Sequence, residues 1–208
     1  MWQVLEENAK TSPNQPAVRE KAFGIWQTWS WHEYSENANY LALGLIDLGM
    51  KDGSPVAIVG NNRRQLYAAM FSVQMAGGIP IPIYQDAVAD EMLHVLQHSE
   101  AKIIIAEDQE QVDKVIELGE KLPKVEKIIY LEEKSMRGYE SEDIISMAKI
   151  LSRGEDPSDK HVKELEKRKL KQTSDTTGVI LYTSGTTGKS KGVVLSNANI
   201  LTAASGAI

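Results

Sequence analysis

Short runs of β-branched apolar residues alternate with longer amphipathic segments along most of the chain. Buried strands of a parallel sheet give such short runs, and helices that cover a sheet give apolar positions at helical spacing. The alternation therefore predicts an α/β fold, with a doubly wound, mostly parallel sheet and flanking helices. We expect strands at residues 55–59, 102–106, 127–131 and 178–182, and helices at residues 63–76, 90–99 and 110–122.

Local signals mark two further elements. Ser30 and Glu33 have the spacing of a capping box, in which each side chain bonds the backbone N–H of the other residue. A helix should follow them and end near Gly49. Residues 79–84 are apolar but include Pro80 and Pro82, which have no backbone N–H to donate. This segment therefore predicts an edge or irregular strand.

Residues 132–175 differ in composition from the rest of the chain. They are rich in charges of both signs and poor in strand formers. Residues 144–151 and 162–170 predict solvated helices. We expect a charged helical excursion at the surface, between strands of the sheet, rather than a binding tail.

Composition and charge narrow the classes of function. The 208 residues, 42% of them hydrophobic, are enough for one core, and the absence of cysteine excludes disulfides and thiolate metal sites. A net charge of -6 without a long basic run argues against nucleic-acid binding. The N-terminus lacks the pattern of a secretory signal, and no apolar run is long enough to span a bilayer. We therefore expect a cytoplasmic location, with a peripheral membrane contact left open.

Residues 179–192, VILYTSGTTGKSKG, have the composition of an anion-binding loop that follows a buried strand. Glycines let the backbone approach a ligand, successive N–H groups bind anions, hydroxyls bind phosphate or a metal, and lysines neutralise charge. The residues of these types are Thr183, Ser184, Gly185, Thr186, Thr187, Gly188, Lys189 and Lys191. Composition alone leaves a flexible surface turn as the alternative.

Two other loop motifs are excluded by single positions. A P-loop needs glycine five positions before Gly188, where this chain has Thr183. A nucleophile elbow needs glycine two positions before Ser184, where this chain has Tyr182. The segment is therefore neither a Walker loop nor the nucleophile turn of a hydrolase.

Residues 182–192, YTSGTTGKSKG, resemble the phosphate-binding motif of the adenylate-forming superfamily, which includes acyl-CoA synthetases, luciferases and the adenylation domains of peptide synthetases. Ser190 departs from the motif, because proline is usual there. Residues 28–62 are similar to the first helix and strand of that family, and residues 79–114 resemble its long-chain fatty-acid–CoA ligases. The resemblance implies that residues 1–208 are the N-terminal portion of the large AMP-binding domain.

The resemblance also implies a reaction and a set of site residues. Such enzymes use ATP and Mg²⁺ to convert a carboxylic acid to its acyl-adenylate, and then transfer the acyl group to coenzyme A. Lys191 would be the catalytic cation that neutralises departing pyrophosphate, and Thr183 would help to hold Mg²⁺. The β- and γ-phosphates would bind Ser184, Gly185, Thr186, Thr187 and Gly188.

Family members run to more than twice this length, and their C-terminal domain supplies a further catalytic lysine. We therefore expect the chain alone not to complete adenylation, so that it shows no ATP–pyrophosphate exchange with fatty acids. Two alternatives stay open. One is a ligase for an aromatic acid or a carrier protein. The other is a non-catalytic nucleotide-binding or assembly module, for example a homodimer.

Two side-chain clusters outside the loop have competing interpretations. His94 and His98 stand four residues apart on an expected helix, one turn after Glu91, which is a spacing that can hold a metal. Without a third ligand we favour surface or packing roles for them. Trp26, Trp29 and Trp31 are favoured as packing residues, and a membrane-interface or acyl-substrate surface is the alternative.

Overall fold

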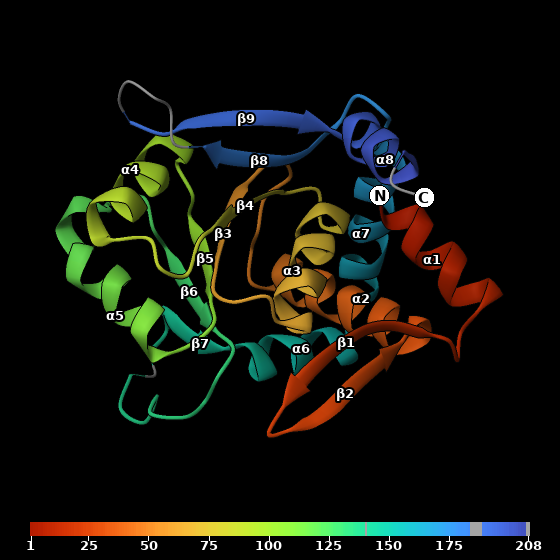
Figure 1. Cartoon of the computed structure of the whole chain (residues 1–208), viewed down its shortest axis with the longest axis horizontal. Helices are drawn as coiled ribbons and strands as arrows, with labels where there is room; N and C mark the ends of the chain where they lie inside the picture. The colour runs from red at the N-terminus through yellow and green to blue at the C-terminus, as the bar shows by residue number, and fades with distance from the viewer. Residues whose placement is uncertain (140, 184–188, 207–208) are drawn as a thin grey trace.

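The computed structural model describes residues 1–139, 141–183 and 189–206. It contains a five-stranded sheet with helices on both faces and two separate two-stranded hairpins (Figure 1). Within the described ranges, no helix is both long and apolar enough to cross a bilayer.

The five-stranded sheet is parallel throughout and has the strand order β4-β3-β5-β6-β7. As predicted, the proline-containing strand lies at an edge, with Pro80 and Pro82 opposite Val56 and Ile58 of its single neighbour. The strands are β3 (Pro55–Val59), β4 (Ile79–Ile83), β5 (Ile103–Ala106), β6 (Lys127–Tyr130) and β7 (Ile144–Ser146).

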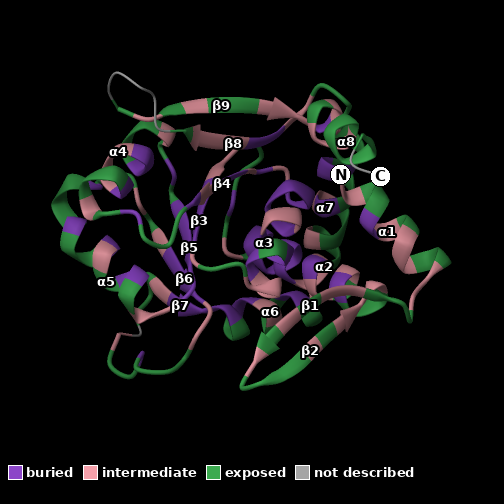
Figure 2. Cartoon of the chain, viewed as in Figure 1, coloured by how far each residue is buried: buried purple, intermediate pink, exposed green. Residues whose placement is uncertain are grey.

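Alternate residues of each central strand enter different cores, which confirms the doubly wound prediction. In β3, Val56 and Ile58 belong to one buried cluster, and Ala57 and Val59 belong to the other. Both faces of these strands are therefore buried, as Figure 2 shows. The first cluster is covered by α1 (Trp2–Thr11), α2 (Trp31–Asp47), α3 (Arg64–Met75), α6 (Met147–Glu155) and α7 (Asp159–Lys171). The second is covered by α4 (Ala89–Ser99) and α5 (Gln109–Leu118), which a short 3₁₀ turn (Gly119–Lys121) follows.

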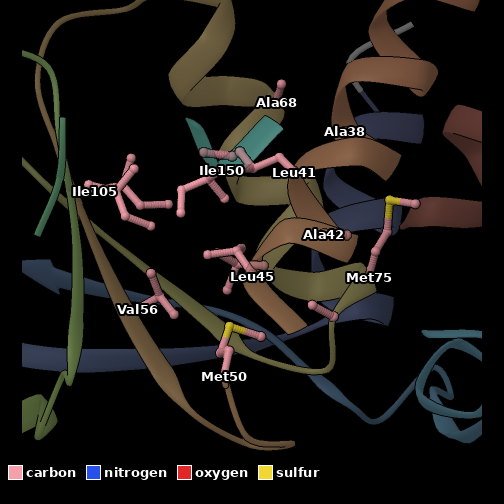
Figure 3. Close-up of a cluster of buried hydrophobic side chains, with 14 of the residues drawn as sticks. Ala38, Leu41, Ala42, Leu45, Met50, Val56, Ala68, Met75, Ile105 and Ile150 are labelled. Carbon is pink, nitrogen blue, oxygen red and sulfur yellow. The ribbon is translucent and has the colours of Figure 1, made fainter. Parts of the chain in front are cut away.

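The predicted capping box starts α2. The Ser30 hydroxyl accepts from the Glu33 backbone N–H at 3.2 Å, and the Glu33 carboxylate accepts from the Ser30 N–H at 2.7 Å. The bond from the Ser30 N–H lowers the pKa of the Glu33 carboxyl, because it favours the charged form. From this start α2 places Leu41 and Leu45 in the core beside Ile150 of α6 (Figure 3).

The helix predicted at residues 144–151 begins later than expected. Ile144, Ile145 and Ser146 form β7, which pairs in parallel with β6 and completes the sheet. The two β-branched isoleucines and Ser146 fill an open sheet edge, which a local pattern does not reveal. Ser146 then caps α6, because its hydroxyl accepts from the Lys149 N–H.

Helix α7 is tied to the sheet through the buried Arg168. Its guanidinium donates to the carbonyl oxygens of Met50 at 2.8 Å and Ala76 at 2.9 Å, and also pairs with Glu164. These two carbonyls come from the turns that precede β3 and β4. Arg168 therefore joins three segments that are distant in sequence.

Two antiparallel hairpins complete the fold. Among their strands only β8 coincides with a predicted strand, and it pairs antiparallel with β9 instead of joining the parallel sheet as expected. The first pairs β1 (Pro16–Ala22) with β2 (Ile25–Ser30). The second pairs β8 (Thr177–Thr183) with β9 (Lys191–Ser196), and α8 (Asn197–Ser205) follows it. The second hairpin lies beside β4 and passes α4 at one end (Figure 1).

Substitution of Gly44 by alanine should destabilise the protein by about 2–3 kcal/mol. A Cβ atom there would overlap the backbone carbonyl of Ile150, which a side-chain rotation cannot relieve. Urea denaturation measures the loss. Gly206→Ala is the matched control, because its Cβ would lie 3.6 Å from the nearest atom and should have little effect. Equal stability of Gly44→Ala and wild type would contradict the packing of α2 against α6.

Candidate functional site

The register of the β8–β9 hairpin brings two predicted site residues together. Thr183 lies directly opposite Lys191, and Tyr182 lies opposite Gly192. Thr183 is the last residue of β8 and Lys191 is the first residue of β9, so this pair stands at the base of the connecting loop. The predicted phosphate-binding positions Ser184, Gly185, Thr186, Thr187 and Gly188 lie outside the described residues.

This register needs glycine at position 192, because the side chains of Ile180 and Tyr182 lie close to its backbone. A Cβ atom at residue 192 would lie 2.9 Å from Cγ2 of Ile180 and 3.3 Å from Cζ of Tyr182. Both contacts are closer than ordinary packing allows, so the strand pair admits the Tyr182 ring because residue 192 has no side chain. The glycine that ends the motif therefore has a packing role.

The cations and the hydroxyl at the hairpin end are accessible. Thr183, Lys189 and Lys191 are exposed. Within the described part of the chain, no carboxylate pairs with the ammonium group of Lys189 or Lys191. Both charges can therefore neutralise an anionic ligand.

Two histidines of α4 hold the segments on either side of the loop. His94 Nε2 lies 2.8 Å from the carbonyl oxygen of Ser190, and His98 Nδ1 lies 2.7 Å from the hydroxyl of Tyr182. Both imidazoles also meet the Tyr182 ring edge to face, with centroids 6.4 Å and 5.7 Å away. The spacing of four residues puts His94 and His98 on one side of α4. This spacing could hold a metal, and here it lets both side chains bond the hairpin.

The hydrogen bonds assign proton positions in this group. A carbonyl oxygen only accepts, so His94 Nε2 carries a proton. Burial raises the pKa of the Tyr182 phenol, which stays neutral at physiological pH. Among the described residues, no group of three His, Asp or Glu side chains is arranged to hold a metal ion.

A cavity of about 660 Å³ lies between α4 and the hairpin end. Its lining includes Tyr84, Leu93, His94, Tyr182 and Lys189. The mixture of apolar walls and a few polar groups, and the volume, are typical of a small-molecule site. Lys189 therefore stands at the edge of a space that can hold a ligand, whereas Lys191 is not among the residues that line it.

A second cavity of about 660 Å³ lies at the first turn of α6. Lys134, Arg137 and Lys149 line it, together with Glu133. It is a competing place for a polyphosphate and provides a control for the assignment to the hairpin.

An ion-pair cluster closes the place at the carboxyl ends of the strands where open α/β sheets often bind ligands. In open parallel sheets, ligands bind where connections leave the carboxyl ends of neighbouring strands in opposite directions, which here is between β3 and β5. Arg63 fills this place, contacting Glu20 at 2.9 Å, Glu107 at 3.3 Å and Glu132 at 3.1 Å. The sequence alone does not reveal this role of Arg63, because its partners come from three separate segments.

Comparisons with known proteins show the family and the fold of the chain. Residues 5–208 match the sequence profile of the AMP-binding enzyme family. The chain is 29% identical over 198 residues to the long-chain-fatty-acid–CoA ligase ACSBG2 of Xenopus laevis, an alignment that covers 95% of this chain and 26% of that protein. Other curated relatives with long-chain-fatty-acid–CoA ligase names are 26–30% identical. The chain spans 26–31% of the length of these relatives.

Solved structures show the same fold. Acetoacetyl-CoA synthetase from Streptomyces lividans superposes with a TM-score of 0.78 at 23% identity, over 96% of this chain and 30% of that one. The anthranilate CoA ligase AuaEII, solved in complex with anthranoyl-AMP, superposes with a TM-score of 0.77 at 20% identity, over 94% of this chain and 34% of that one. With a profile match over nearly the whole chain, this chain belongs to the AMP-binding enzyme family, whose members are ligases that form acyl-adenylates.

Proposed function

We propose that this chain provides the triphosphate-binding part of an ATP-dependent acid–CoA ligase. The observation that carries the proposal is the pairing of Thr183 with Lys191 at the open end of the hairpin. This pairing places a hydroxyl and a cation side by side at the base of the loop whose composition predicts phosphate binding.

The reaction requires this charge arrangement. A carboxylate oxygen attacks the α-phosphorus of ATP, and pyrophosphate leaves with the electrons of the broken P–O bond. The sulfur of coenzyme A then attacks the acyl carbon and AMP leaves. Lys191 supports the first step by neutralising the charge that gathers on pyrophosphate. Residues 184–188 would add backbone N–H groups to the same phosphates.

Thr183 fits a limited role toward Mg²⁺. The ion prefers oxygen ligands, usually keeps several waters, and binds ATP through one or two protein groups and the phosphates. The exposed Thr183 hydroxyl provides one such oxygen at the hairpin end. A bound Mg²⁺ would neutralise phosphate charge beside Lys191.

The names of the curated relatives support a long-chain fatty acid as the substrate. Solved structures of the same fold include an anthranilate ligase and an acetoacetyl-CoA synthetase, so the fold accommodates acids of other shapes. The long-chain assignment therefore rests on sequence similarity, and the acyl-adenylate chemistry rests on membership of the AMP-binding enzyme family.

Replacement of Lys191 by alanine should weaken binding of MgATP at least tenfold, a change of about 1.4 kcal/mol, because one unpaired cation is lost from the phosphate site. Isothermal titration calorimetry on the 208-residue chain measures the effect. Lys134→Ala, which removes a cation from the cavity at α6, is the matched control and should bind like wild type. Absence of MgATP binding in wild type, or equal affinity in Lys191→Ala, would favour a non-catalytic assembly module.

Replacement of His94 by alanine should weaken MgATP binding about three- to tenfold, because the segment between the loop and β9 loses its anchor at Ser190. His94→Gln retains a donor of similar reach and should recover much of the affinity. The same titration tests both variants, with circular dichroism to confirm folding. If the alanine variant binds as tightly as wild type, α4 has no part in positioning the loop.

A further inference from the structure

The tip of the β1–β2 hairpin exposes three large apolar side chains. The exposed fractions are 102% for Phe23, 64% for Ile25 and 61% for Trp26. The base of the same hairpin is different, because Val18 and Trp29 pack against the buried core. Figure 1 shows the tip extending past the helices at the lower edge of the molecule, and Figure 2 shows it as exposed. The apolar side chains therefore form a convex projection that no described part of the chain covers.

The turn at this tip places phenylalanine where other residues fit better. Ala22 pairs with Ile25, so the loop has two residues, Phe23 with φ 52° and Gly24 with φ 78°. Such turns favour asparagine, aspartate or glycine at the first position, because a bulky side chain is strained at positive φ. Strain of this kind is characteristic of functional positions. The fold therefore gives no reason for an aromatic ring at this position.

The charges of the hairpin divide between its two faces. Arg19 and Lys21 are exposed and lie opposite Thr28 and Trp26, so that their side chains share one face with Trp26. Glu20, on the other face, is turned to the body of the protein, where it contacts Arg63 and the backbone N–H of Arg64. The outer face of the hairpin is therefore cationic, although the net charge of the chain is -6.

We infer that this hairpin tip is a contact for the surface of an anionic lipid bilayer. Aromatic side chains with an apolar body are favoured at the boundary between lipid headgroups and acyl chains. Lysine and arginine at that depth are attracted by anionic headgroups, and the two contributions together give reversible binding. A convex aromatic tip with flanking cations matches a lipid surface better than a grooved protein partner. The inference requires neither the nucleotide site nor the proposed ligase activity.

Co-sedimentation of the 208-residue chain with vesicles tests the inference, in the absence of nucleotide. We expect binding to phosphatidylcholine vesicles that contain about 30% phosphatidylserine, and several-fold weaker binding to phosphatidylcholine alone. Phe23→Asn should reduce binding at least about fivefold while it leaves the thermal midpoint unchanged or higher, because asparagine suits the turn. The double change Arg19→Gln, Lys21→Gln should remove the preference for anionic lipid.

Two controls separate lipid contact from other causes. Leu170→Asn removes another exposed apolar side chain, 80% accessible, on α7 and should not alter vesicle binding. Brominated lipids should quench the fluorescence of wild type more than that of Trp26→Phe. The inference is overturned if wild type does not sediment with anionic vesicles, if Phe23→Asn binds as wild type does, or if Leu170→Asn binds as weakly as Phe23→Asn. The inference is also overturned if the chain forms oligomers through the tip. In that case Phe23→Asn would dissociate the oligomers, and added vesicles would leave them intact.

Discussion

The antiparallel register of β8 and β9 is the constraint on which the site depends. Thr183 meets Lys191 because Tyr182 meets Gly192, and the latter pairing works because glycine leaves room for the tyrosine ring. In an antiparallel pair, a slip of one residue would move each side chain to the opposite face. The hydroxyl and the cation would then no longer stand together at the end of the hairpin.

The rest of the fold holds this hairpin beside α4. The parallel sheet is buried on both faces, so its position is rigid, and α4 packs on it through Met92 and Leu96. From that support, His94 reaches Ser190, just before β9, and His98 reaches Tyr182 of β8. At the sheet itself, Arg63 and three carboxylates close the crevice between β3 and β5. The cavity beside the hairpin lies between α4 and the end of the hairpin.

Much of this arrangement could be predicted from local pattern, and the remainder depends on contacts between distant segments. Residues nearby in sequence determine three of the elements: the capping box at Ser30, the strand at Pro55–Val59 and the edge strand with two prolines. Strand β7 could not be recognised, because its three residues become a strand only beside β6. The sequence shows the four-residue spacing of His94 and His98, but not their partners. These lie at residues 190 and 182, more than eighty positions away. The roles of residues 184–188 are still predictions, since these residues lie outside the described ranges.

The most direct test of this account is a map of backbone amide shifts in the nuclear magnetic resonance spectrum as magnesium pyrophosphate is added to the chain. Pyrophosphate carries the charge that the hairpin is proposed to bind and has no adenine or acyl group to bind elsewhere. The account predicts that the largest shifts fall within residues 182–192, with smaller ones at His94 and His98. Shifts concentrated at Lys134, Arg137 and Lys149, with residues 182–192 unchanged, would contradict it.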